Sequence, residues 1–212
     1  MCIRDSRDTL REATARGDVL VTLGGASMGT ADLVKDVLAE MGFVLDFWRV
    51  KMRPGSPFSF GTLPRKGMAP LPVFGLPGNP ASSFVTFQLL VRPFLLRLAG
   101  ERAIHRAVVD ARAGVALKSH PERTLFTRVL LEVDDAGRLV AVPTGAQGSG
   151  LVRSLGEAHG LAVVPAGPPC PAGTHVSVLL LADGPAADPE PGYLDALRAP
   201  SRAPGSTGDA SS

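Results

Sequence analysis

The sequence predicts an α/β layer over residues 7–101, followed by a small all-β domain over residues 102–183. In the first part, short apolar runs alternate with helical stretches, which is the order of a parallel sheet covered by helices. In the second part, strand-like segments follow one another between turns, without a competing helix. That order is typical of a barrel or a sandwich.

Composition narrows the class of protein before any motif is considered. The chain has 212 residues, of which 45% are hydrophobic, enough for a real core. A net charge of +2 gives no argument for nucleic-acid binding. Cys2 and Cys170 stand far apart and the four histidines are isolated, so neither a disulfide framework nor a protein-built transition-metal site is predicted. The longest apolar run is interrupted by Arg92, Pro93 and Arg97, and no signal peptide is visible. We therefore expect a cytoplasmic protein without membrane contact.

Each element of the α/β part has its own pattern. The helix expected over 30–41 carries an apolar stripe opposite its charged residues, and Gly42 fits its stop position. The segment 44–53 alternates between apolar and basic residues, as a strand does. The other elements expected here are a helix over 7–16, strands over 18–23 and 72–76, and a long apolar helix over 81–100 with a kink near Pro93.

The β part and the two chain ends complete the predicted organisation. Strand-like segments are expected over 106–117, 124–133, 138–142, 160–164 and 175–181. Residues 1–6 (MCIRDS) join abruptly to the helical segment after them and resemble an artefactual start. Residues 184–212 are rich in Pro, Ala, Gly and Ser, so a disordered tail is predicted.

A glycine-rich turn joins the first strand to its helix. Gly24, Gly25, Ser27 and Gly29 stand at the mouth of the helix, and Asp32 lies in its first turn. Free backbone N–H groups and the helix dipole favour an anion such as phosphate at this place. A tight corner with an acidic residue that complements the dipole explains the same residues equally well, because a short glycine turn is a weak motif.

Three cations follow at alternate positions: Arg49, Lys51 and Arg53. On one strand face they repel each other unless an anion compensates, so a polyanionic ligand is one explanation. A solvent-facing edge strand is the other explanation, and it is somewhat favoured by the pattern alone.

A second turn, GLPGNPASS over 75–83, repeats the strand–turn–helix order of the first. Asn79 can cap the helix or bind a ligand, Ser82 can donate a hydrogen bond, and Pro80 suits a helix start. A stiff turn that only caps its helix is the simpler explanation. Because two such turns follow neighbouring strands, they are expected to open on one sheet edge, which favours a shared site.

A third loop lies in the β part. Its residues, TGAQGSG over 144–150, are small and polar enough to reach a ligand. A flexible loop is the explanation that the sequence alone favours.

Taken in order, several segments resemble the MoeA family of molybdopterin molybdenumtransferases, whose relatives include the catalytic end of gephyrin. The resemblance covers about residues 8–181 and rests on DVLVTLGGASMGTAD, RPGSPFSFGTL, VFGLPGNPASSFVTFQLLVRPFLLRLAG, RTLFTRVLLEV and PTGAQGSG. It implies a three-layer α/β sandwich of the molybdenum cofactor biosynthesis type, followed by a small β-barrel. Family members carry two earlier domains and an opening strand that this chain lacks, so a C-terminal fragment is expected.

The resemblance also implies an activity. The family cleaves adenylylated molybdopterin, releases AMP and inserts molybdenum from molybdate, with Mg²⁺ assisting. It works as a homodimer whose site is completed by the missing domains, so this chain alone is expected to be inactive. Contact with a molybdopterin adenylyltransferase is a further implied partnership. Every reactant is an anion, which suits a site that neutralises charge and positions groups without a protein nucleophile.

Site residues are implied by the resemblance position by position. Asp32 matches an acid that the family needs for activity, and it is expected to hold Mg²⁺ or a proton. Arg49 and Arg53 match basic positions assigned to oxyanion or phosphate binding. The remaining residues expected to contact substrate are Gly24, Gly25, Ser27, Gly29, Gly78, Asn79, Ser82 and Ser149.

Departures from the family pattern leave two alternatives. Thr30 stands where glutamate is frequent and Ser56 where lysine is frequent, and Asp5 is the nearest match to a further family acid. A molybdopterin adenylyltransferase-like enzyme ranks lower, because such enzymes usually carry GGTG where this chain has GGAS and because a β domain follows. A non-catalytic, gephyrin-like binding module is the other alternative.

Overall fold

The structure is a computed structural model that describes residues 3–24, 33–145, 147 and 153–181. The chain divides into two compact units, Met1–Arg92 and Pro93–Ser212, and each is described by itself. The predicted disordered tail lies outside the described residues.

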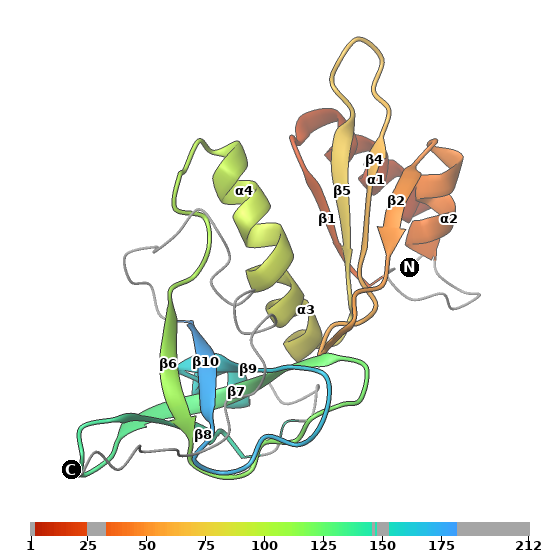
Figure 1. Ribbon diagram of the computed structural model, residues 1–212. Coiled ribbons are helices and arrows are strands. Elements are labelled where there is room, and N and C mark those ends of the chain that lie inside the picture. The colour runs from red at the N-terminus through yellow and green to blue at the C-terminus, as the bar shows by residue number, and fades with distance from the viewer. Residues whose placement is uncertain (1–2, 25–32, 146, 148–152, 182–212) are drawn as a thin grey trace, which may run out of the picture. The chain divides into compact units, whose positions relative to one another are not determined.

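The first unit is built on a mixed four-stranded sheet (Figure 1). Its strand order is β1 (Leu20–Leu23), β5 (Leu71–Leu76), β4 (Ser59–Leu63) and β2 (Val44–Trp48). Only β1 and β5 are parallel, while β4 pairs antiparallel with both β5 and β2. The prediction of a parallel sheet is therefore right for one pair only. The proline- and glycine-rich segment after β2 turns the chain straight back, so β2 and β4 form an antiparallel hairpin.

Two helices cover one face of this sheet. Helix α1 (Ile3–Arg16) confirms the helix expected over 7–16 and begins earlier, and the expectation of an artefactual start stays a prediction. Helix α2 (Leu33–Glu40) confirms the described part of the helix expected over 30–41, and Gly42 follows it at φ 86°. The core that they share with the strands consists of Leu10, Leu20, Val37, Leu38, Leu63, Leu71 and Val73.

The long helix predicted over 81–100 is divided into three successive segments. These are α3 (Pro80–Thr86), a π-helical turn η1 (Phe87–Val91) and α4 (Arg92–Leu98). The N–H of Arg92 donates to the carbonyl oxygen of Phe87, five residues back. The widened turn precedes Pro93, which has no N–H and whose ring would clash in a regular helix. The irregularity expected near Pro93 is thus a π-helical turn.

The second unit is a closed five-stranded barrel. All five predicted strands are present: β6 (Val108–Ala113), β7 (Thr124–Val133), β8 (Leu139–Pro143), β9 (Gly160–Val164) and β10 (His175–Leu180). The long strand β7 pairs with β9 through its first half and with β8 through its second, and β6 and β10 complete the circle. This double pairing decides for a barrel over a sandwich. A short helix, α5 (Arg153–Gly156), was not predicted.

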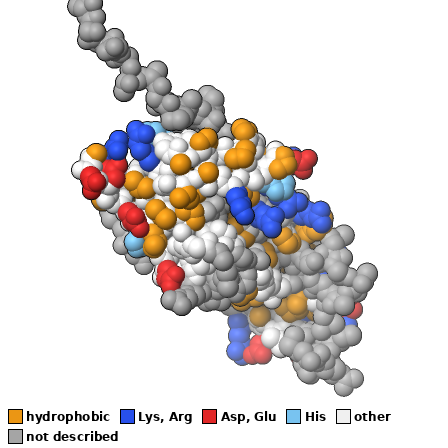
Figure 2. All heavy atoms as spheres, turned by 90° about the horizontal axis from the view of Figure 1, so that it is seen from below, with side chains coloured by type: hydrophobic (Ala, Val, Ile, Leu, Met, Phe, Trp, Pro, Cys, Tyr) orange, Lys and Arg blue, Asp and Glu red, His pale blue; other side chains and the backbone are white. Residues whose placement is uncertain are grey.

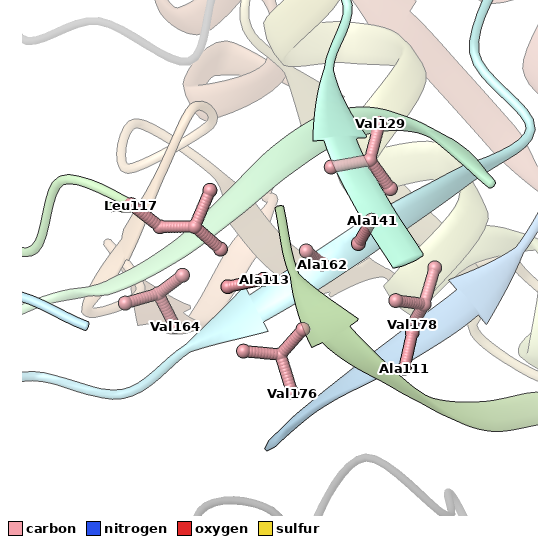
Figure 3. Packing of buried hydrophobic residues seen from close by; sticks show 9 residues of the cluster. All are labelled: Ala111, Ala113, Leu117, Val129, Ala141, Ala162, Val164, Val176 and Val178. Carbon is pink, nitrogen blue, oxygen red and sulfur yellow. The ribbon is translucent and has the colours of Figure 1, made fainter. Parts of the chain in front are cut away.

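Small and branched side chains fill the barrel (Figure 3). Val129, Ala141, Ala162 and Val178 have no exposed surface, and they belong to a cluster with Ala111, Ala113, Leu117, Val164 and Val176. Successive side chains of a strand point to opposite faces, and these residues point into the barrel. The apolar positions of the alternating sequence pattern are therefore the positions of the core. On the face drawn in Figure 2, Lys and Arg, Asp and Glu, and hydrophobic side chains are interspersed, in keeping with the net charge of +2.

The turn between β7 and β8 is held by one carboxylate. Asp134 Oδ1 accepts hydrogen bonds from the N–H groups of Ala136 (3.0 Å) and Arg138 (2.9 Å), and Oδ2 accepts one from Arg138 Nε (2.8 Å). Gly137 supplies the left-handed residue of the turn at φ 75°. These bonds, first among them the side-chain bond from Arg138, hold the pKa of the Asp134 carboxyl below its ordinary value of 3.8.

This turn predicts an acid-dependent stability of the barrel. Because the folded-state pKa of Asp134 is lowered, its contribution is present above the ordinary value and is lost as pH falls through the folded-state pKa. We expect Asp134→Asn to remove part of the pH dependence of amide hydrogen-exchange protection in β7 and β8 below about pH 4. Asp135→Asn is the matched control, since it removes a carboxyl of the same turn and leaves the Asp134–Arg138 bonds in place. Identical acid profiles for the two variants would contradict the prediction.

Candidate functional site

The two predicted turns open on the same edge of the sheet. Strands β1 and β5 are parallel and in register, with Leu23 opposite Leu76, so both end at one rim. The N–H of Gly24 donates to the carbonyl oxygen of Leu76 at 2.9 Å, and a Cβ on Gly78 would lie 3.7 Å from the Gly24 Cα. Gly24 has φ 87°, a conformation that suits glycine. The expected convergence of the turns is therefore present in the described residues.

A third segment reaches the same rim, namely residues 49–58 between β2 and β4, which we call the basic loop. Trp48 pairs with Ser59, and Ser59 pairs with Gly75 near the carboxyl end of β5. The N–H of Arg49 donates to the carbonyl oxygen of Phe58 at 2.8 Å, which closes the base of the loop. Figure 1 shows these strand ends at one edge of the sheet, beside α3.

The basic loop corrects the prediction of one alternating strand over 44–53. Strand β2 ends at Trp48, and a two-residue strand, β3 (Met52–Arg53), follows after a break. The break is at Arg49, whose φ of 72° is left-handed. Loop closure through the Arg49 N–H holds this conformation against local preference, which the alternation of residue types does not reveal. Exposure still alternates, since Arg49, Lys51 and Arg53 are exposed and Met52 is 6% exposed.

The basic loop is fixed by close packing on α3. Gly55 is buried at φ 103°, and a Cβ there would lie 2.5 Å from Thr86 Cγ2 and 3.4 Å from the carbonyl oxygen of Ser82. The peptide bond between Arg53 and Pro54 is cis. The cations of the loop are thus carried on a backbone that packs directly against the helix following the second turn.

Asn79 stands at the N-cap of α3, where capping and ligand binding are its two predicted roles. Its side chain makes no capping hydrogen bond, which favours ligand binding. Asn79 Oδ1 is buried and finds no hydrogen-bond partner in the described part of the chain. A buried polar atom without a partner costs free energy, which a ligand at the rim would recover. Ser82 is 7% exposed, and its contact with substrate stays a prediction.

An apolar hollow adjoins the two turns on the face of the sheet that α3 borders. It measures about 570 Å³ and is shallow and open. Its apolar lining comes from both the sheet and the helix, with Gly78 and Ser83 at its margin: Val21, Leu23, Leu76, Pro80, Phe84 and Phe87. The rim therefore combines two glycine turns and exposed cations with an apolar surface.

In the barrel unit, Gln147 of the third loop and Arg128 of β7 form a contact that the sequence did not predict. Gln147 Oε1 accepts the N–H of Arg128 at 2.9 Å, and Gln147 Nε2 donates to the Arg128 carbonyl oxygen at 3.1 Å. The amide thus holds Gln147 to β7. Arg128 itself is 1% exposed, and burial lowers the pKa of its guanidinium. A lone cation within the apolar run TLFTRVLLEV is the signal that marks it.

Several predicted site residues cannot be placed. Gly25, Ser27, Gly29, Asp32 and Ser149 lie outside the described residues. Within the described ranges, no three His, Cys, Asp or Glu side chains gather as a metal site. None of the helices that can be described is both long and apolar enough to cross a membrane.

Comparison with known proteins identifies both units. Residues 2–97 match the family described as "Probable molybdopterin binding domain", and residues 110–181 match the "MoeA C-terminal region (domain IV)". The two matches follow in the order of the two structural units. The chain belongs to the MoeA family. Because a MoeA domain IV follows the α/β unit, a stand-alone adenylyltransferase is disfavoured.

Relatives and solved structures agree with this placement in the MoeA family. Molybdopterin molybdenumtransferase from Haemophilus influenzae is 36% identical over 144 residues, which are 68% of this chain and 34% of that protein. Gephyrin from Dictyostelium discoideum is 34% identical over 181 residues, covering 77% of this chain and 25% of that protein. A molybdopterin biosynthesis MoeA protein from Pyrococcus horikosii superposes with a TM-score of 0.66 at 34% identity, covering 84% of this chain and 41% of that one. The chain thus spans about a third of the length of the first of these relatives.

Proposed function

We propose that this chain carries the part of a molybdopterin molybdenumtransferase that holds adenylylated molybdopterin. The whole reaction inserts molybdenum from molybdate and releases AMP. The observation that supports this most strongly is the meeting of three segments at one rim: the turn at Gly24, the turn at Gly78–Asn79 and the basic loop. Family membership supplies the reaction, and the rim supplies groups suited to its reactants.

The rim suits a reaction in which both substrates are anions. Arg49 and Arg53 are exposed on the basic loop, which packs on the helix that follows the second turn, and in this proposal they neutralise phosphate and oxyanion charge. In the same proposal Gly25, Ser27, Gly29 and Gly78 offer N–H and hydroxyl donors, while Gly24, whose N–H is bonded to the carbonyl oxygen of Leu76, lines the turn and lets the ligand approach its backbone. The apolar hollow next to Gly78 offers a surface for the planar pterin ring. The role of these residues is to position the reactants and stabilise negative charge.

We propose further that Asp32 and the Asn79 side chain hold Mg²⁺. The orphaned Asn79 Oδ1 is a hard oxygen donor, and together with a carboxylate it forms the kind of donor set that Mg²⁺ prefers. When bound, Mg²⁺ supplies positive charge next to the phosphates of the substrate. Ser82 and Ser149 complete the proposed binding residues as hydroxyl donors.

The proposal includes the assembly in which the site works. The chain spans only a third of the related molybdenumtransferase, so we propose that the complete enzyme adds further residues to this rim. We also propose that it acts as a homodimer in the cytoplasm, receiving its substrate from a molybdopterin adenylyltransferase. On this proposal the 212-residue chain binds adenylylated molybdopterin and turns it over slowly or not at all.

Binding and turnover measured on the same chain test the proposal. We expect adenylylated molybdopterin to bind, Arg53→Gln to weaken binding about fivefold, and AMP release with molybdate and Mg²⁺ to be negligible. Asp32→Asn should remove the effect of Mg²⁺ on binding. Lys66→Gln, at an exposed cation in the loop between β4 and β5, is the matched control. Equal binding by the Arg53→Gln and Lys66→Gln variants would overturn the anion site, and fast AMP release would overturn the need for further residues.

A further inference from the structure

Trp48 and Arg49 form a stack that their places in the sequence do not predict. The Arg49 Cζ lies 4.0 Å from the centroid of the Trp48 ring. Successive side chains of a regular strand point to opposite faces, so neighbours 48 and 49 would point apart if β2 continued. Strand β2 ends at Trp48, and the left-handed φ of 72° at Arg49 turns its side chain back over the ring.

The unusual backbone conformation is held by its surroundings. The Arg49 N–H donates to the carbonyl oxygen of Phe58, and Trp48 is paired with Ser59 in the sheet. A left-handed conformation is unfavourable for a residue that carries a Cβ, and such residues gather at functional sites. Here the left-handed conformation of Arg49 places its guanidinium over the indole ring of Trp48.

We infer that Trp48 is a positioning residue, which holds the Arg49 guanidinium in one orientation at the anion site; this inference rests on the function proposed above. An exposed arginine side chain samples many rotamers, and binding an anion requires it to be ordered. Stacking on Trp48 orders it beforehand. The ring covers one face of the guanidinium and leaves its N–H edges open for two parallel hydrogen bonds to a phosphate or oxyanion.

The chain allows this stack to be observed directly. Trp48 is its single tryptophan, so selectively excited tryptophan emission reports on this residue alone. With inorganic pyrophosphate as the probe, we expect the emission of the wild-type chain to change on binding. In the Arg49→Gln variant the change should disappear, while the Lys66→Gln control should respond as the wild type does.

A double-mutant cycle separates positioning from structural support. By calorimetry at low ionic strength, we expect Trp48→Leu to weaken pyrophosphate binding about two- to fivefold, and Trp48→Phe to weaken it less because a ring remains. In the Arg49→Gln background, Trp48→Leu should have no further effect, since no guanidinium remains to be oriented. Urea unfolding of each variant confirms that the folded state is compared.

The outcomes distinguish this inference from the proposed function. If Arg49→Gln binds pyrophosphate as the Lys66→Gln control does, the anion site is wrong and the proposed function fails with it. If Arg49→Gln weakens binding while Trp48→Leu does not, the positioning role alone is overturned. The positioning role is also overturned if Trp48→Leu weakens pyrophosphate binding by an equal factor in the wild-type and the Arg49→Gln backgrounds.

Discussion

Gly55→Ala is expected to lower the free energy of unfolding of the first unit by about 3 kcal/mol. Two causes combine at this position. The φ of 103° is unfavourable for any residue with a Cβ, and that Cβ would lie 2.5 Å from Thr86 Cγ2. Cβ atoms in proteins do not lie this close to another carbon atom, so either the basic loop or α3 has to move. Urea unfolding followed by Trp48 emission measures the effect, because the single tryptophan lies in this unit.

Two further variants separate the steric cost of Gly55→Ala from the cost of its backbone conformation. Thr86→Ser removes the methyl group that a Cβ at position 55 would meet and keeps the hydroxyl that donates to the carbonyl oxygens of Ser82 and Ser83. Combined with Gly55→Ala it should recover part of the lost stability. Gly67→Ala, at φ 72° with open space around it, should show the backbone cost alone, about 1 kcal/mol. If Gly55→Ala costs no more than Gly67→Ala, the packing of the basic loop on α3 is not as described.

Gly55→Ala is also expected to weaken pyrophosphate binding, and by more than a substitution that only lowers stability would. The basic loop carries Arg49 and Arg53, and Gly55 is its contact with α3. Moving the loop away from α3 separates these cations from the turn at Gly78–Asn79. We therefore expect the folded Gly55→Ala variant to bind pyrophosphate more weakly than the Gly67→Ala variant.

Gly61→Ala has the second large expected effect, a loss of about 3 kcal/mol with displacement of β2. A Cβ at this position would lie 2.2 Å from the carbonyl oxygen of Val44 and 2.6 Å from the ring of Phe43. Val44 belongs to β2, which pairs with β4 and leads to Trp48. The crowded atom is backbone, so the edge strand has to move as a whole. Trp48 emission should shift in the folded variant, together with a lower urea midpoint.

Phe43→Leu provides the contrast for this prediction. It removes the ring that a Cβ at position 61 would meet and leaves the carbonyl oxygen of Val44 in place. The double variant Gly61→Ala/Phe43→Leu should therefore recover little stability, unlike the combination of Gly55→Ala with Thr86→Ser. Full recovery would show that only the ring limits the space at Gly61, and that the β2–β4 pairing tolerates a side chain there.

Much of the fold can be predicted from local pattern. The strands of the barrel and the helices α1 and α2 are where the alternation and the apolar stripes predict them, because burial of one face dictates that periodicity. The β2–β4 hairpin and the π-helical turn before Pro93 were not predicted. The hairpin depends on where β4 finds its partners, and the π turn on how the helix accommodates a proline, and neither is visible in residue type alone.

The candidate site, like the fold, could be predicted from the sequence only in part. The sequence by itself determined which groups are present: two turns of small residues, three cations at alternate positions and the order of segments shared with the MoeA family. Only the tertiary structure decided that the turns and the basic loop end at one rim, since strand pairing, which joins Leu23 to Leu76 and Ser59 to Gly75, is not local. It also decided that Arg49 lies on Trp48 instead of across the strand from it. The physical reason is that a hydrogen bond from another strand, at Phe58, holds a backbone conformation that Arg49 would not adopt alone.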